Sequence, residues 1–287
     1  MLFFVGLIVV IGCVVGGYMG NGGHMGVLWQ PFEFVIIFGA AFGAFIIGNP
    51  SHIIKDALHS LKNLVKGTPY NKSDYSELLG FLYNIFKVMK TKGMLQIEAD
   101  IDKPESSELF TKYPKFAGDH HNVAFVCDYL RMLTMGVDNH YQLEDLMVGE
   151  LDSHHHHYDE VATSLSNMAD GMPALGIVAA VLGVIHTMGS ITEPPEVLGH
   201  LIGGALVGTF MGVFISYGFV APMAAFIKKY QTAKGTYLQV VKAAIIAHVQ
   251  GNAPMISVET ARKIIPDKIR PSFSELDQII NGSGGEK

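Results

Sequence analysis

Long stretches of this chain lack lysine and arginine. All 20 of these basic residues lie in Lys55–Arg131 or Lys228–Lys287, so residues 1–50 and 171–227 contain none. The apolar runs of the chain lie in these two basic-free stretches. Lysine and arginine collect on the cytoplasmic side of membrane proteins, so this segregation predicts an integral membrane protein with a cytoplasmic polar part. The formal net charge of -6 belongs to that polar part and gives no reason to expect a nucleic-acid partner.

Cysteine and catalytic motifs are also scarce. Cys13 lies in the first apolar run and Cys127 in the polar insert, so they cannot meet and no disulfide framework is expected. The sequence has no phosphate-binding loop, no nucleophile elbow and no HExxH motif, so we expect neither an enzyme nor a cofactor. The run His154–His157 is better interpreted as a solvated linker than as a metal site, because four adjacent side chains cannot all face one ion.

Four apolar stretches each approach the ~20 residues that cross the hydrocarbon core of a bilayer. The sequence predicts spans from about Leu2 to Gly20, Val27 to Gly48, Met172 to Ser190 and Leu198 to Ile227. The connectors within the first pair and within the second pair contain no lysine or arginine. We therefore place both connectors outside and both chain termini in the cytoplasm.

The polar part is predicted to be helical. Apolar residues recur at helical spacing and predict amphipathic helices at residues 75–92, 119–135 and 141–165. No segment alternates as a strand would, so the expected fold is all-α, with four transmembrane helices and a large helical cytoplasmic insert. The predicted parts are a membrane pair at 1–50, the insert at 51–170, a second membrane pair at 171–227, and a cytoplasmic tail at 228–287, helical to about Arg262 and disordered from residue 281.

Small residues recur at every fourth position in the last two predicted spans. They are Gly204, Gly208, Gly212 and Ser216 in the fourth span, and Ala179, Gly183 and Thr187 in the third. Such ladders let helix backbones approach closely in lipid. Two interpretations stay open: the two spans pack against each other, or they also receive a helix from a partner chain.

The predicted spans hold almost no charge. Among Asp, Glu, Lys and Arg, only Glu33 falls within a span, and we place it near the outer end. Proton relays normally use a buried ionisable side chain, so ion conduction here would require a carboxylate from another chain. His186, in the outer part of the third span, titrates in a range that suits proton movement, although a neutral, hydrogen-bonded histidine is the simpler interpretation.

Two prolines accompany the last two spans. Pro173 stands just after Asp170, where proline suits the first turn of a helix. Pro222 lies inside the fourth span, where its missing N–H frees a backbone carbonyl and predicts a kink. A purely structural kink and a hinge that couples the membrane to the cytoplasm are both compatible with this position.

The apolar segments resemble those of a known family. Two N-terminal segments read GLIVVIGCVVGGYMGNGGHMG and QPFEFVIIFGAAFGAFIIGNP, and two later ones read PALGIVAAVLGVIHTMGS and GALVGTFMGVFISYGFVAPMA. Together they are similar to the four spans of the longer, proton-type members of the MotA family, and the resemblance covers almost the whole chain. These proteins are stator subunits of the bacterial flagellar motor. The resemblance implies a protein of the bacterial inner membrane that couples proton flow to torque.

The resemblance also implies partners and an ion path. Family members form a ring of five around two MotB chains, each of which supplies a membrane helix with the aspartate that takes up the ion. It implies that Pro173 and Pro222 are coupling prolines, and that Thr209 and Tyr217 line the path beside MotB. Ala180 stands where sodium-driven relatives carry threonine, so the implied ion is the proton.

A rotor-facing surface is implied as well. In the family, a basic and an acidic residue of the cytoplasmic loop meet opposite charges on the rotor protein FliG, and here these positions read Lys90 and Glu98. Many relatives have arginine at the first position; lysine keeps the charge and loses the planar fork. Glu150 falls at another charged position of the family.

Two other functions remain as alternatives. An ExbB- or TolQ-like energiser of outer-membrane processes would share the last two spans, but those relatives lack an extra N-terminal pair such as residues 1–50. A membrane scaffold that conducts nothing is the other, and it would tolerate changes at Thr209 and Pro173.

Overall fold

The computed structural model of the protein describes residues 2–282, and every regular element within that range is a helix. The chain divides into two compact units. The membrane unit joins the residues up to Gly67 with His156–Tyr230, and the polar unit joins Thr68–His155 with the residues from Gln231 onward. The four-part division expected from the sequence stays a prediction. Of the end that we expect to be disordered, Asn281 and Gly282 instead belong to a helix, and residues 283–287 lie outside the described residues.

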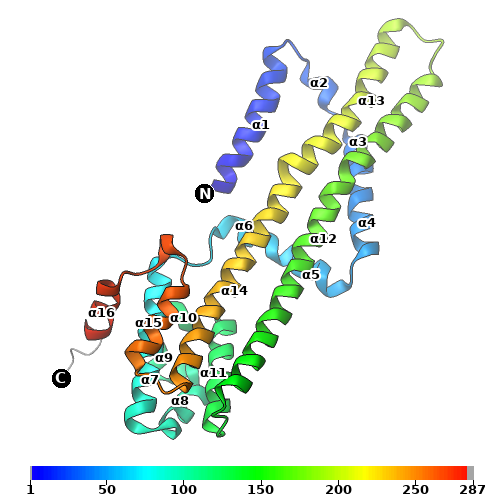
Figure 1. Cartoon of the computed structure of the whole chain (residues 1–287). Coiled ribbons are helices and arrows are strands. Elements are labelled where there is room, and N and C mark those ends of the chain that lie inside the picture. The colour runs from blue at the N-terminus through cyan, green and yellow to red at the C-terminus, as the bar shows by residue number, and fades with distance from the viewer. Residues whose placement is uncertain (1, 283–287) are drawn as a thin grey trace. The chain divides into compact units, whose positions relative to one another are not determined.

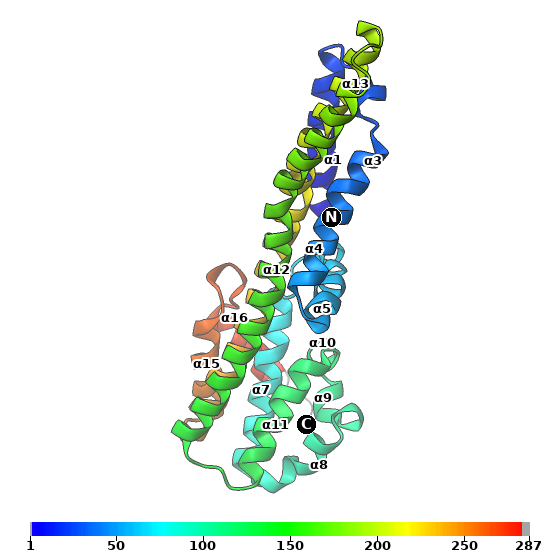
Figure 2. The ribbon, with the colours of Figure 1, turned by 90° about the vertical axis from the view of Figure 1, so that its right-hand side faces the viewer.

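The membrane unit contains the predicted spans. Four helical stretches are long and apolar enough to cross a membrane, namely Leu2–Gly20, Met25–Gly48, His140–Met188 and Pro195–Val249, which confirms the predicted four spans. The elements are α1 (Leu2–Gly20), α2 (Met25–Leu28), α3 (Pro31–Phe34), α4 (Ala40–Gly48), α5 (Ser51–Leu61), α6 (Asn63–Lys66), α12 (His140–Met188), α13 (Pro195–Ile215) and α14 (Ala221–Val249), of which α12 and α14 continue into the polar unit. In both Figure 1 and Figure 2, α12 and α13 lie side by side.

The second span is interrupted near its start. α2 ends at Leu28, and Gln30 has φ −122° and ψ 79°, outside the helical region. Pro31 then begins α3, since the residue before a proline is pushed out of the helical region and a proline suits the first helical position. A π-helical turn, Val35–Gly39, joins α3 to α4. The break redirects the chain just before Glu33.

The third span is longer than predicted. α12 runs for 49 residues with Pro173 in its interior, so the expected helix end near residue 165 and the placement of Pro173 in a first turn are both wrong. Proline cannot donate to the carbonyl four residues earlier, here that of Ala169. The helix continues because another chain segment supplies that hydrogen bond, as described below.

The fourth span changes its hydrogen bonding rather than ending. α13 stops at Ile215, a π-helical turn occupies Ser216–Val220, and α14 begins at Ala221 with Pro222 as its second residue. The N–H of Ala221 donates to the carbonyl of Ser216, five residues back. Such single π turns mark places where a helix ladder is locally rearranged, often at functional sites.

The polar unit is built around one hydrophobic core. Its elements are α7 (Lys72–Lys92), α8 (Glu98–Asp102), α9 (Glu108–Thr111), α10 (Pro114–Ala117), α11 (His120–Thr134), α15 (Pro254–Ile264) and α16 (Phe273–Gly282), with the first part of α12 and the last part of α14. The predicted helices at 75–92 and 119–135 are confirmed as α7 and α11. The predicted helical tail is interrupted after Val249, where Gly251 takes φ +89°.

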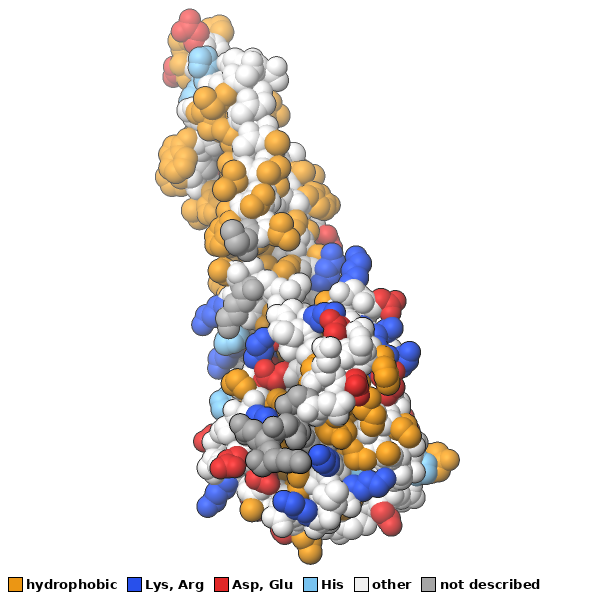
Figure 3. All heavy atoms as spheres, turned by 90° about the vertical axis from the view of Figure 1, so that its left-hand side faces the viewer, with side chains coloured by type: hydrophobic (Ala, Val, Ile, Leu, Met, Phe, Trp, Pro, Cys, Tyr) orange, Lys and Arg blue, Asp and Glu red, His pale blue; other side chains and the backbone are white. Residues whose placement is uncertain are grey.

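Helix α7 forms the centre of this core. Asn71 caps its start, accepting from the backbone N–H groups of Ser73 and Asp74, while the Asp74 carboxylate accepts from the N–H of Asn71. Its buried face carries Phe81 and Phe86, both fully enclosed. In Figure 3, hydrophobic side chains cover much of the membrane unit, and Lys and Arg side chains gather over the polar unit.

Candidate functional site

The backbones of α12 and α13 approach each other closely. A Cβ atom added at Gly212 would lie 2.7 Å from the carbonyl oxygen of Met172 and 2.8 Å from the Cα of Gly176. The two antiparallel helices meet again at Gly183, where an added Cβ would lie 2.7 Å from the Cβ of Ala205. Glycine is required at these crossings because no side chain fits between the backbones.

The second span occupies the rest of the small-residue ladder on α13. An added Cβ at Gly204 would meet the Gln30 side chain at 3.0 Å, and one at Gly208 would meet Oε2 of Glu33 at 2.9 Å. The ladder is therefore filled within the chain, by α12 at Gly208 and Gly212 and by the segment around α3 at Gly204 and Gly208. The two spans do pack against each other, while a further helix from a partner chain stays a prediction.

Glu33 reaches from α3 to the small-residue ladder of α13. Its Oε2 is buried and has no hydrogen-bond partner among residues 2–282. Its other oxygen lies 3.6 Å from the point where a Cβ of Gly183 would stand. The acid therefore sits where the second, third and fourth spans meet. A lone acidic residue in an apolar run was the available signal, but its contact with α13 follows from the break at Gln30, which the sequence analysis did not predict.

A side chain that sequence reasoning missed completes the helix pair. Ser216 is fully buried, and its Oγ donates to the carbonyl of Ala169 at 2.6 Å. That carbonyl is the one that Pro173 leaves without its helical donor. The serine begins the π turn that precedes Pro222, so one hydrogen bond connects the irregularities that accompany the two prolines. The sequence analysis grouped Ser216 with the glycines that precede it at every fourth position, as another small residue, and therefore did not predict this hydrogen bond.

The predicted ion-path residues divide into two groups. Ala180 and Thr209 are half-buried beside the crossing, and the backbone nitrogen of Ala180 lies 3.1 Å from the added Cβ at Gly208. Tyr217 is 60% exposed in the single chain, and His186 is exposed too. The structure therefore brings Ala180 and Thr209 to one place, and leaves Tyr217 and His186 on outward faces. Of the two prolines, Pro173 is half-buried and Pro222 exposed.

The exposed faces of the helix pair are strongly apolar. They carry Ile177, Val178, Val181, Leu182, Ile185, Leu206, Phe210 and Val213 on α12 and α13. Contiguous exposed apolar surface of this kind requires lipid or another protein chain to cover it.

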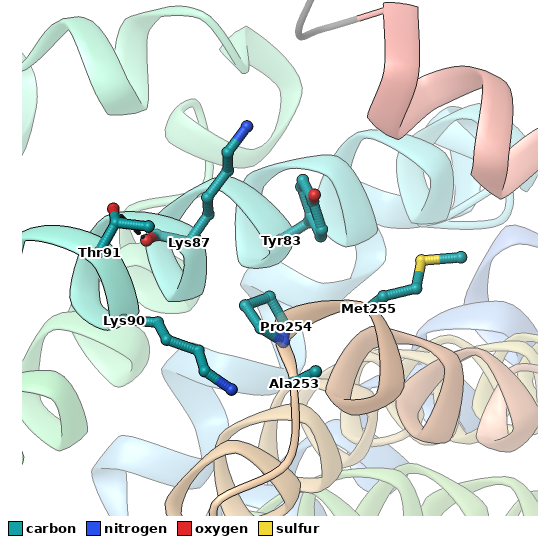
Figure 4. Close-up of a pocket in the computed structure, with 7 residues that line it drawn as sticks. All are labelled: Tyr83, Lys87, Lys90, Thr91, Ala253, Pro254 and Met255. Carbon is teal, nitrogen blue, oxygen red and sulfur yellow. Dashed lines mark hydrogen bonds between the residues drawn. The ribbon is translucent and has the colours of Figure 1, made fainter.

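Lys90 lines a cavity in the polar unit. The cavity has a volume of about 300 Å³ and lies between α7 and the start of α15, lined by Tyr83, Lys87, Lys90, Thr91, Ala253, Pro254 and Met255. Figure 4 shows the Lys90 side chain extending toward Ala253, while the ammonium of Lys87 points away from Pro254. Glu98 is exposed at the first position of α8. Within residues 2–282, neither Lys90 nor Glu98 forms a salt bridge, so both charges are available to a partner.

Glu150 lies in a different setting. Its Oε2 accepts a hydrogen bond of 2.7 Å from the Tyr129 hydroxyl, which joins α11 to α12. Burial and this hydrogen bond raise the pKa of Tyr129 well above its usual value. His154 stands 3.7 Å from the other Glu150 oxygen. The structure shows that Glu150 forms a hydrogen bond inside the polar unit, and the rotor contact that the sequence analysis assigned to it together with Lys90 and Glu98 stays a prediction.

The chain is similar to proteins of known families along nearly all of its length. Residues 4–93 match the model of the motility protein A N-terminal region, and residues 119–239 match that of the MotA/TolQ/ExbB proton channel family. It is 41% identical over 280 residues to motility protein A of Salmonella typhimurium and equally to that of Escherichia coli, covering 98% of this chain and 95% of each relative.

The fold has a counterpart among solved structures. A chain in the structure of C. jejuni MotAB superposes with a TM-score of 0.79 at 20% identity, over 94% of this chain and 98% of that one. At 20% identity this match supports the fold alone, and it agrees with the helical architecture described above. The identity to the enterobacterial relatives decides the family: the chain belongs to the motility protein A family of membrane proteins.

Proposed function

We propose that this protein is a stator subunit of the bacterial flagellar motor and couples proton flow across the inner membrane to torque on the rotor. The observation that carries the proposal is the 41% identity to motility protein A across almost the full length of both chains. The membrane unit supports it, because its apolar faces and its close helix pair require further chains or lipid around them. The proposed function consists of ion transport and torque generation and includes no bond-making reaction. It therefore includes no enzymatic activity and no cofactor.

The partner in this proposal is a MotB-like chain. The solved relative is a MotAB assembly, and a ring of five copies around two such partner helices is the arrangement that the family resemblance implies. Both connectors between spans would face the periplasm, and both termini the cytoplasm, because the basic residues lie in the polar stretches. The partner helices would face the exposed sides of α12 and α13, near Ala180, Thr209 and Tyr217.

The proposed step depends on charge in lipid. An ionised carboxylate at the centre of a membrane helix costs ~2.5–3.5 kcal/mol on insertion scales, whereas its protonated form tolerates an apolar wall much better. Protonation of the partner's acid would therefore change how the partner helix packs against α12 and α13. The close contact at Gly212 and the hydrogen bond from Ser216 to Ala169 join these two helices, which suits transmission of such a change.

The direct test is rotation in a strain that lacks its own stator. Expressing this chain with its partner should restore rotation, and expressing it alone should not, since the chain lacks the acid that we assign to the partner. Replacing external sodium by potassium at fixed membrane potential should leave the speed unchanged if protons drive the motor. Arrest in potassium would contradict the assignment of the ion, and failure to rotate in either medium would contradict the stator function.

Lys90 and Glu98 provide a test of the rotor-facing surface. The double change Lys90→Glu with Glu98→Lys should reduce swimming strongly while leaving the amount of membrane-bound protein unchanged, because it reverses two exposed charges that make no salt bridge within the described chain. Exposed charge pairs contribute only ~0.2–1 kcal/mol each, so low ionic strength should enlarge the effect.

A matched control uses another exposed pair of the same unit. Lys103→Glu with Glu105→Lys preserves the net charge in the same way, and both residues are exposed beyond α8. Equal swimming defects in the two double variants would show that general surface charge, and not the Lys90–Glu98 surface, matters.

A further inference from the structure

Glu33 is the single strong charge carried by the membrane-embedded stretches of this chain. Between residues 25 and 48, 171 and 188, and 197 and 227, no other Asp, Glu, Lys or Arg occurs. The proposed function assigns the ion-binding acid to a partner chain and gives Glu33 no role. An acid inside a membrane protein is expensive to keep and is usually retained for a purpose.

The surroundings of Glu33 disfavour its ionised form. Oε2 is enclosed beside Gly208 and lacks a hydrogen-bond donor within residues 2–282. Ala180 of α12 also lies beside Gly208, so it marks the level of the Glu33 carboxyl group along α12. Ala180 is eight residues before the end of α12 at Met188, or roughly 12 Å along the helix. A buried carboxylate with no donor loses its hydration without compensation, whereas the protonated acid loses much less.

The other titratable groups of the neighbouring elements do not compensate this charge. They are His24 before α2, His186 on α12, Glu193 in the connector, Glu196 and His200 on α13, and Tyr217 in the π turn, and all of them are exposed. No described hydrogen bond or salt bridge joins any of them to Glu33. Among the described residues, the carboxyl group therefore has no fixed counter-charge.

We propose that Glu33 is a second proton-binding site of the stator, placed between the periplasmic water and the acid of the partner chain. This inference rests on the proposed function. Oε2 takes up a proton from the periplasmic side and holds it in the protonated carboxyl group. The same proton then leaves toward the crossing at Gly208 and Thr209, which returns Glu33 to the ionised form until the next proton arrives. One proton enters and one leaves in each cycle, and no other bond changes.

The first experiment measures the protonated carboxyl group directly. The complete complex in native membranes is treated near neutral pH with dicyclohexylcarbodiimide, which reacts with protonated carboxyl groups in apolar surroundings, and the peptide that contains Glu33 is analysed by mass spectrometry. Glu33 should be modified, and the exposed Glu193 and Glu196 in the same chain should not. An unmodified Glu33, or labelling no greater than at Glu196, would overturn the proposal.

The second experiment measures proton delivery. Glu33→Gln keeps the size of the neutral acid but cannot release a proton, so rotation at low load should slow by roughly tenfold or more. The dependence of speed on external pH at constant proton motive force should also disappear. A Glu33→Gln motor that turns at wild-type speed with the wild-type pH dependence would reduce Glu33 to a packing residue and overturn the proposal.

Two further arms keep the test decisive. Glu33→Asp retains an exchangeable proton on a shorter side chain, so the motor that carries it should rotate with a shifted pH dependence of speed. If the Glu33→Asp motor shows the same pH dependence as wild type, the relay is contradicted, even where Glu33→Gln does not assemble. Wild-type chain with its partner serves as the reference for rotation. If that reference fails to rotate, the stator function is wrong, while the carbodiimide result still decides whether Glu33 holds a proton.

Discussion

Replacing Ser216 by alanine should lower the free energy of unfolding of the membrane unit by about 1–3 kcal/mol, the usual penalty for a buried polar group left without its partner. The hydroxyl is fully buried, and it donates a hydrogen bond of 2.6 Å to the carbonyl of Ala169. Because Pro173 removes the helical donor for that carbonyl, loss of the serine hydroxyl takes away the hydrogen bond that replaces it. Slower rotation should accompany the loss of stability, since the two helices are no longer clamped.

A double-mutant cycle with Pro173→Ala isolates this mechanism. Alanine at position 173 restores a backbone N–H that can donate to Ala169, so removing the Ser216 hydroxyl in that background should cost at least about 1 kcal/mol less than in wild type. The free energies can be compared by denaturant titration of the purified complex. Equal costs in the two backgrounds would show that Ser216 acts independently of the proline.

Thr187 offers a matched control on the same helix pair. Its Oγ1 donates to the carbonyl of Gly183 at 2.9 Å, and it is almost as buried as Ser216. The Gly183 carbonyl keeps its ordinary helical donor, so the isosteric change Thr187→Val removes only a second hydrogen bond. It should cost clearly less than Ser216→Ala, and a comparable loss would indicate a general sensitivity to hydroxyl removal.

The sequence predicted elements wherever one local signal dominated. The confinement of lysine and arginine to two stretches gave the four spans, and the apolar spacing with Gly93 at its end gave α7. These features depend on composition and on neighbours along the chain. They survive in the structure because nothing in the tertiary fold competes with them.

The sequence interpretation failed where distant segments compensate a local rule. Pro173 signals a helix boundary, yet α12 continues through it because Ser216, 43 residues later, supplies the missing bond. The contact of Glu33 with α13 depends on the break at Gln30 and on the glycines of α13, which a local pattern does not reveal. The hydrogen bond between Tyr129 and Glu150 likewise follows from the packing of α11 against α12, while the rotor contact of Glu150 stays a prediction. Single-sequence patterns contain no direct information on such pairings.

The largest effect is expected at Gly212. Changing this residue to alanine usually favours a helix by about 0.5–1 kcal/mol, but here the added Cβ would lie 2.7 Å from the carbonyl of Met172 and 2.8 Å from Gly176, closer than real Cβ atoms approach. Both contacts are with backbone, which cannot rotate away, so α12 and α13 must separate. Overpacking typically costs about 1–3 kcal/mol, which outweighs the gain in helix propensity.

Gly212→Ala should therefore destabilise the membrane unit and slow or stop rotation, and Gly212→Val should prevent assembly of the stator. Denaturant titration and the amount of complex recovered from membranes measure the two effects. Gly199→Ala on the same helix is the control, since an added Cβ there meets nothing within 4 Å and should leave stability equal or slightly higher. If Gly212→Ala instead matches Gly199→Ala in stability and speed, α12 and α13 can separate at little cost, and the close crossing is not what holds the ion path together.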